Sequence, residues 1–329
     1  MNSELMTLCN DFIRNRDIIK QDFKMENVYI YPVCANVFLG KRQNVEPDKM
    51  QNCLRILKEN TGVFSNFRGN GRIPMLSMLA LDSAPEEKFR KALTFYSKLK
   101  DYFWGSEYLA VASMIVTELV DETRYEEVAE RTRKIYEIMK AEHPFLTSSE
   151  DSVFASLLAL SDKTEAEMVR EVEACYNRLK PDFFSGNAVQ SLSHVLALGE
   201  GSVEDKCKRV MDIFYALREK GCKYGTDYQL ATLGALALLP VDIETLVDEM
   251  IDVDIFLSGQ KGYGFFGIEK RTRIMHAAMI VSTYHTDQND NNLMGAAALS
   301  GSIALVAAQQ AAMCAAIAAS GAAAASAGN

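Results

Sequence analysis

The sequence has few of the features that mark secreted or nucleic-acid-binding proteins. Its seven cysteines form no C-x-x-C pair and fall mostly within helical apolar patterns, so we expect reduced, buried thiols and no disulfide framework. The N-terminus lacks the apolar stretch of a signal peptide. No basic stripe is visible, and the formal net charge is -9 at pH 7. We therefore expect a cytoplasmic protein that binds no nucleic acid.

Motifs for metal binding and for the common catalytic mechanisms are also scarce. No G-x-S-x-G, P-loop or H-E-x-x-H sequence occurs. His276 and His285 are nine residues apart and would face opposite sides of one helix, and His194 is expected to be a core residue with satisfied ring nitrogens. The run 287–292 begins like a calcium loop but lacks the glycine and the closing glutamate. We predict no metal ion and no other cofactor.

A repeat of about 40 residues dominates the chain. Five apolar runs rich in Leu, Ala and Ser are each followed by a turn and a charged, amphipathic stretch. In that second stretch an aromatic recurs three residues before Leu or Met, at Tyr96, Tyr136, Tyr176 and Phe214. One such hairpin cannot bury its own apolar face, so neighbouring copies must stack. The pattern predicts an all-α fold, an α-α superhelix (solenoid) of about seven hairpins.

Each pair of hairpins is joined by a connector that contains an aromatic residue, then Gly or Ser, then a helix-capping residue. The connector aromatics are Phe64 and Phe67, 102–104 (YFW), Phe145, Phe183–Phe184 and Tyr224. The pattern is typical of a helix stop followed by an N-cap, with the aromatic filling the seam between hairpins. An aromatic-lined ligand site along one rim is the alternative.

Together these features resemble a bacterial family catalogued as domain of unknown function number four thousand and three (DUF4003). The resemblance rests on 59–69 (ENTGVFSNFRG), on 96–100 (YSKLK) and on 192–198 (LSHVLAL), and it spans about residues 5–285. It implies the helical-repeat fold and contributes no catalytic residue. The domain expected from these patterns is 1–285, followed by a polar linker and an Ala-rich tail over 286–329.

A glycine motif and a set of basic residues are the strongest candidates for ligand contacts. Residues 262–267 match G-x-G-x-x-G, but the preceding stretch is helical in pattern, which argues against a dinucleotide fold. Glycines beside bases suit an anion. The candidate anion or partner contacts are Arg68, Arg72, Lys270, Arg271 and Arg273.

The tail and a set of acidic residues leave two further functions open. Residues 293–329 carry no charge, and their larger apolar residues form one narrow helical stripe, as in a docking or self-association helix. Membrane contact is less favoured, because Ala is barely apolar and no basic cluster flanks the segment. Acids that could line the rim of a closed α/α toroid, each equally explained as a helix cap, are Glu107, Glu150, Asp151, Asp182, Asp227 and Glu269.

From these patterns we expect a non-catalytic scaffold that binds a protein partner. The alternatives are an α/α-toroid enzyme that uses rim carboxylates and a sensor of small anions or nucleotides. A closed ring with two carboxylates converging on a deep pocket would favour the enzyme, whereas an open arc would favour the scaffold.

Overall fold

The computed structural model describes residues 1–24, 26–264, 267–290 and 311–318, with the side chains of 287–290 left out. The expected all-α fold is confirmed. The described helices are α1 (Ser3–Asp22), α2 (Ile30–Leu39), α3 (Pro47–Asn60), α4 (Arg72–Ala80), α5 (Pro85–Lys100), α6 (Glu107–Leu119), α7 (Tyr125–Glu142), α8 (Asp151–Leu158), α9 (Glu165–Leu179), α10 (Gly186–Leu198), α11 (Val203–Glu219), α12 (Leu230–Ala237), α13 (Ile243–Ser258) and α14 (Lys270–Asp290). Two short 3-10 turns, η1 (Asn66–Arg68) and η2 (Glu122–Arg124), lie between them.

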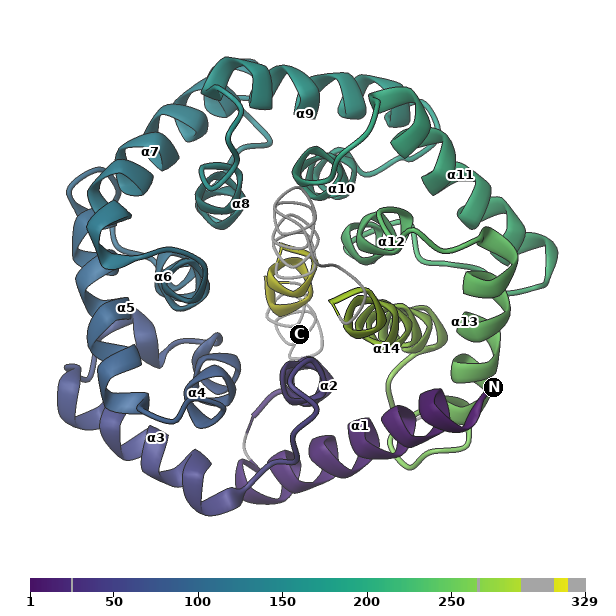
Figure 1. Cartoon of the computed structure of the whole chain (residues 1–329), viewed down its shortest axis with the longest axis horizontal. Helices are drawn as coiled ribbons and strands as arrows, with labels where there is room; N and C mark the ends of the chain where they lie inside the picture. Colours follow the sequence, from purple (N-terminus) through teal and green to yellow (C-terminus); the bar gives the residue numbers. More distant parts are fainter. Residues whose placement is uncertain (25, 265–266, 291–310, 319–329) are drawn as a thin grey trace.

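The helices alternate between two concentric layers (Figure 1). The odd-numbered helices form the outer layer, and their apolar stripes face inward while Glu, Lys and Arg face solvent. The even-numbered helices form the inner layer and are buried along most of their length. The apolar runs of the repeat therefore correspond to inner helices, and the charged stretches to outer helices.

The two ends of the repeat meet and close the superhelix into a ring (Figure 1). Inner helix α14 packs against α2, and outer helix α1 packs against α13 and α14. The Thr283 hydroxyl donates to the Asn36 side-chain oxygen at 3.3 Å, and the Asn2 amide donates to the Tyr284 hydroxyl at 3.1 Å. The leading and closing helices thus complete the seventh hairpin across the join.

One aromatic pair fills each of four successive seams between hairpins. Phe67, Phe103, His143 and Phe183 from the connectors contact Tyr96, Tyr136, Tyr176 and Phe214 of the outer helices, with ring centroids 4.6–5.3 Å apart. These partners are the aromatics that mark the repeat in the sequence. Three of these contacts are edge-on and the one between His143 and Tyr176 is tilted; such ring contacts add to the free energy gained by burial.

The core follows the ring instead of gathering at one point. It divides into two clusters of buried residues, one mainly over α2 to α9 together with 311–317, the other mainly over α9 to α14 with much of α1. All seven cysteines are free and buried, as expected from their place in apolar helices. Among the described residues, no helix combines the length and the hydropathy that crossing a bilayer requires.

Candidate functional site

The lumen of the ring is the candidate site, and its wall is apolar. Between their first and last turns the seven inner helices contain no Asp, Glu, Lys or Arg. Their small hydroxyl side chains are satisfied within their own helices: Ser77 donates to the Ile73 carbonyl at 3.0 Å and Ser113 to the Leu109 carbonyl at 2.7 Å. Few polar groups of the wall therefore remain to bind water or a polar ligand.

A C-terminal helical segment, residues 311–318, lies inside this lumen (Figure 1). Ala311 and Ala316 are 0% and 1% exposed, and Met313, Cys314 and Ile317 are each 6% exposed. The segment belongs to the same buried cluster as residues from α4, α6 and α8. The ring thus encloses a helix of its own chain.

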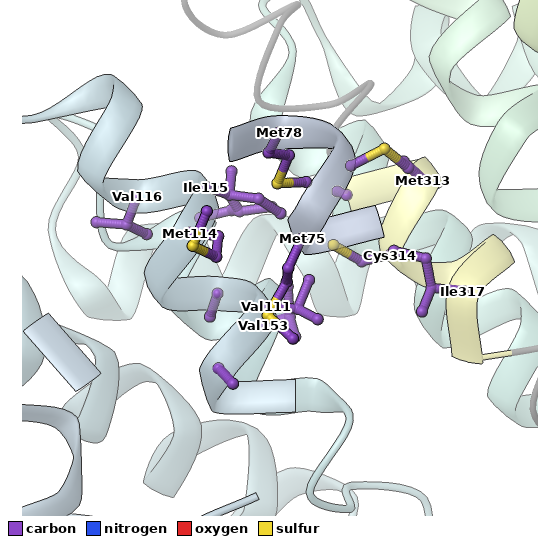
Figure 2. Packing of buried hydrophobic residues seen from close by; sticks show 14 of the residues in the cluster. Met75, Met78, Val111, Met114, Ile115, Val116, Val153, Met313, Cys314 and Ile317 are labelled. Carbon is purple, nitrogen blue, oxygen red and sulfur yellow. The ribbon is translucent and has the colours of Figure 1, made fainter. Parts of the chain in front are cut away.

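Several methionines belong to the buried cluster that joins the wall to this segment. Figure 2 shows Met75 and Met78 of α4 lying between Met114 of α6 and the segment that carries Met313 and Cys314. A thioether chain is flexible and polarisable, so it can pack against surfaces of differing shape. Such a wall can accept more than one apolar occupant.

A cavity of about 670 Å³ lies between the enclosed segment and the wall, at the end of the lumen where the inner helices terminate. Met78, Met279 and Met313 line its apolar part. Its edge is polar: Lys88 forms an ion pair with Glu118 and donates to the Met78 carbonyl at 3.0 Å. The volume is that of a typical ligand site.

A second polar feature is a buried pair between α8 and α10. Asp151 and His194 are 3% and 0% exposed, with the Asp151 Oδ1 3.8 Å from the His194 Nδ1. Burial raises the pKa of Asp151 to about 7, although the Ser148 amide donates to its Oδ2 at 2.7 Å and opposes the rise. Burial lowers the pKa of His194 to about 3. Both groups are therefore mainly neutral at pH values between these two pKa values.

The expectation for His194 was only partly right. The residue is in the core, where its ring lies 4.8 Å from that of Phe154. However, neither ring nitrogen has a hydrogen-bond partner among the described residues. The sequence could not reveal this, because it depends on which apolar side chains of α8 face α10.

The other histidines are held by neighbours in the structure. The rings of His143 and His285 contact the carboxylates of Glu173 and Glu249 at 2.8 and 2.5 Å. The Nδ1 of His276 pairs with the Tyr263 hydroxyl at 2.9 Å. Among the described residues, no three His, Cys, Asp or Glu side chains lie close enough together to hold a metal ion.

The acids expected along the rim lie at the connectors or the first turns of inner helices. Glu107 accepts from the Asn70 amide at 2.8 Å and so fastens one connector to the next helix. Asp182, Asp227 and Glu269 are exposed. Glu150 is half-buried, and burial raises its pKa. Of these acids, only Asp151 is buried, at 3% exposed, and none of the six lines the cavity described above.

The basic residues proposed from the sequence lie at the same rim, and three of the five already have partners. Arg68 donates to the carbonyls of Lys58 and Thr61 at 2.8 and 2.6 Å. Arg72 pairs with Glu26. Arg273 pairs with Asp254 at 2.7 Å, both side chains being 12% exposed.

Lys270 and Arg271, the other two of the five, are exposed at the start of α14. The described part of the G-x-G-x-x-G motif forms a turn before them, in which Gly262 and Gly264 adopt φ values of 92° and 128° that favour glycine. The element before this turn is helix α13, as expected, and not the strand of a dinucleotide-binding unit.

The fold and the lumen define the class of protein, which is a closed ring of α-hairpins around an enclosed helix. The chain belongs to the family described as "Protein of unknown function (DUF4003)", whose model matches residues 15–311. It is also similar to "Uncharacterized protein YeaA" of Bacillus subtilis (strain 168), with 23% identity over 297 residues that cover 87% of this chain and 86% of that protein. No solved structure is significantly similar.

Proposed function

We propose that this protein is a non-catalytic binding ring whose lumen holds an apolar helix. Its own C-terminal segment is the occupant at rest, and a helical segment of a protein partner replaces it in the working state. One observation carries the proposal: residues 311–318 are buried inside the ring among inner helices. The seven free, buried cysteines are consistent with the cytoplasmic location that we propose for it.

The chemistry of the lumen supports a helix over a polar substrate. An α-helix satisfies its own backbone hydrogen bonds, so it can enter a wall that offers few polar groups. The wall has no charged side chain in its middle, and residues 293–329 have none either. Helix-in-groove recognition of this kind relies on apolar anchors at i and i+4, which Met313 and Ile317 provide here.

Binding in trans tests the proposal. Substitution Ala316→Glu puts a carboxylate at a position that is 1% exposed, and the cost of burying it should drive the segment out of the lumen. A fluorescent peptide of residues 303–322 should then bind the variant, as measured by polarisation, and should bind the wild-type ring far more weakly. A peptide with Met313→Lys and Ile317→Lys is the matched control and should bind neither protein.

The result that contradicts the proposal is an Ala316→Glu ring that remains folded and binds neither peptide. Equal binding of both peptides would also contradict it, because contact with apolar anchors is the basis of recognition. Circular dichroism and gel filtration of the variant establish that the ring is intact before either result is read.

An α/α-toroid enzyme is the second candidate, and ring closure with the Asp151–His194 pair is the observation in its favour. A buried acid whose pKa lies near neutrality is typical of general acid–base catalysis. Turnover in a broad hydrolase screen that disappears in Asp151→Asn would support the enzyme over the binding ring.

A further inference from the structure

Four successive connectors present a second aromatic side chain directly to solvent. Phe64, Trp104, Phe145 and Phe184 are each 97–101% exposed. Every one follows the end of an outer helix and precedes the next inner helix, so all four lie on the same face of the ring. Their positions are about one hairpin apart. These residues do not fill the seams, which the other connector aromatics already occupy.

In two of these connectors, those of Phe145 and Phe184, a lysine of the preceding outer helix holds the backbone in place. The Lys140 ammonium donates to the carbonyls of Pro144 and Thr147 at 2.7 and 2.6 Å. Lys180 donates to the Phe183 and Phe184 carbonyls, both at 3.3 Å. Because the loops are fixed before any ligand arrives, binding costs little conformational entropy.

A hollow of about 570 Å³ lies beside Trp104, where connector 101–106 faces helix α7. Tyr102, Phe103 and Tyr136 line it together with the indole. Phe103 packs edge-on against Tyr136 at 5.2 Å, which fixes the wall opposite the exposed indole. The hollow therefore combines a rigid aromatic side with a free aromatic face.

The polar lining of the hollow is mixed, and four of its groups are not engaged elsewhere. In the part of the chain that the structure describes, no hydrogen bond or ion pair is assigned to the Tyr136 hydroxyl, the Ser149 hydroxyl, the Lys100 ammonium or the Asp101 carboxylate. The other polar groups of the lining are already engaged. The Arg133 guanidinium pairs with Glu137 at 2.6 Å and donates to the Tyr102 carbonyl at 2.9 Å. The Tyr102 hydroxyl donates to Glu126 at 3.3 Å, the Ser106 hydroxyl accepts from the Leu109 backbone amide at 3.2 Å, and the Ser152 hydroxyl donates to the Ser149 carbonyl at 2.6 Å. Free hydroxyls and one charge of each sign suit a neutral ligand with many hydroxyl groups.

We propose that the hollow beside Trp104 is a saccharide-binding subsite and that the exposed aromatics extend it along the rim. A sugar ring presents an apolar C–H face, which packs on an indole, and hydroxyls, which hydrogen-bond to Tyr136, Ser149, Lys100 and Asp101. Neighbouring packed helices are about 10 Å apart, so the next aromatic along the rim, Phe145, is within reach of an oligosaccharide but not of a single sugar.

Two other ligand classes fit the hollow less well. A phosphate would find only Lys100 available, and the Asp101 carboxylate next to it is repulsive. A lipid surface needs no hollow, and burying the free polar groups of this one against acyl chains would be costly. These classes are included as outcomes of the test below.

The chain contains a single tryptophan, Trp104, so tryptophan fluorescence, excited selectively over tyrosine, reports on this hollow alone. The intact protein is titrated separately with cellohexaose, maltohexaose and chitohexaose up to about 1 mM, a range that detects weak binding. The expected result is a blue shift of the emission and slower quenching by acrylamide with at least one of them. Unchanged emission with all three overturns the proposal, as does a shift produced only by ATP or only by phosphatidylcholine vesicles.

Variants that retain Trp104, the fluorescent reporter, identify which residues contact the saccharide. Tyr136→Phe removes one hydroxyl and should weaken binding of the active hexasaccharide by about twofold to tenfold. Phe145→Ala should weaken binding of that hexasaccharide but not of the corresponding disaccharide. Tyr215→Ala, at a 45% exposed position on outer helix α11, is the matched control and should leave both unchanged. Equal loss in the control and in Tyr136→Phe would contradict the assignment.

Discussion

The wall of the ring and the helix inside it are stabilised in different ways. Wall helices carry local signals: Thr164 and Glu167 form a reciprocal capping box at the start of α9, and Ser106, Ser202 and Asp242 cap other helices. The enclosed segment 311–318 has no charged side chain and is buried by contacts with residues distant in sequence. Local sequence signals therefore fix where the wall helices begin and end, whereas the position of the enclosed segment depends on closure of the ring.

The largest expected effect on stability distinguishes two adjacent phenylalanines, Phe183 and Phe184. Phe183 is 4% exposed and packs on Phe214, whereas Phe184 is fully exposed. We expect Phe183→Ala to lower the free energy of unfolding by about 3–5 kcal/mol and Phe184→Ala to change it by less than about 0.5 kcal/mol. Urea unfolding followed by circular dichroism measures both. Similar losses in the two variants would show that the connector packs differently.

The buried acid should make the stability of the wall depend on pH. Asp151 keeps its proton in the fold up to about pH 7, whereas the unfolded residue loses it near pH 4. The contribution of Asp151 to the free energy of unfolding is therefore fully present below about pH 4 and is lost as the pH rises from about 4 to 7. Asp151→Asn should gain stability relative to the wild type over that window, by a few kcal/mol in total, and urea midpoints at successive pH values measure the difference.

The effect of His194 on stability has the opposite pH dependence, so it has to be distinguished from the effect of Asp151. It stays neutral in the fold, so its contribution is present above about pH 6.5 and is lost as pH falls toward 3. Comparing Asp151→Asn with the wild type leaves the His194 contribution in both proteins. A difference in midpoint that does not vary with pH would contradict the neutral state assigned to Asp151.

A smaller effect tests how closely the inner helices approach. A Cβ atom at Gly234 of α12 would lie 2.8 Å from the Leu192 Cδ1 of α10 and 3.1 Å from a Val195 methyl. We expect Gly234→Ala to cost about 1–3 kcal/mol through this crowding. Gly62, whose added Cβ would meet nothing within 4 Å, is the control. Thermal unfolding should show a lower Tm for the first variant only.

Much of the wall could be predicted from the sequence because its signals are local and repeated. Tyr96, Tyr136, Tyr176 and Phe214 mark equivalent positions of successive outer helices, and each contacts a connector residue as a repeat requires. Ring closure could not be predicted. The contact between Asn36 and Thr283 joins residues 247 positions apart, and neither residue differs in type from ordinary helix residues.

The candidate site was less accessible to sequence reasoning than the wall. The narrow apolar stripe of the tail predicts a docking helix, but nothing in its sequence indicates that the docking surface is the lumen of its own ring. The distinction between Phe183 and Phe184 is equally hidden, since adjacent identical residues carry the same local signal. Asp151 resembled an ordinary capping residue until the packing of α8 on α10 placed it beside His194.

Protection of Cys314 is the most direct test of the account. This thiol lies on the enclosed segment, and it should resist pulse alkylation in the native wild type as strongly as fully buried Cys175, with peptides mapped by mass spectrometry. Ala316→Glu should make Cys314 reactive while Cys175 stays protected, and Ala318→Glu, at a half-buried position, should not. Alkylation of Cys314 in the native wild type at the rate seen in the unfolded chain would contradict the occupied lumen.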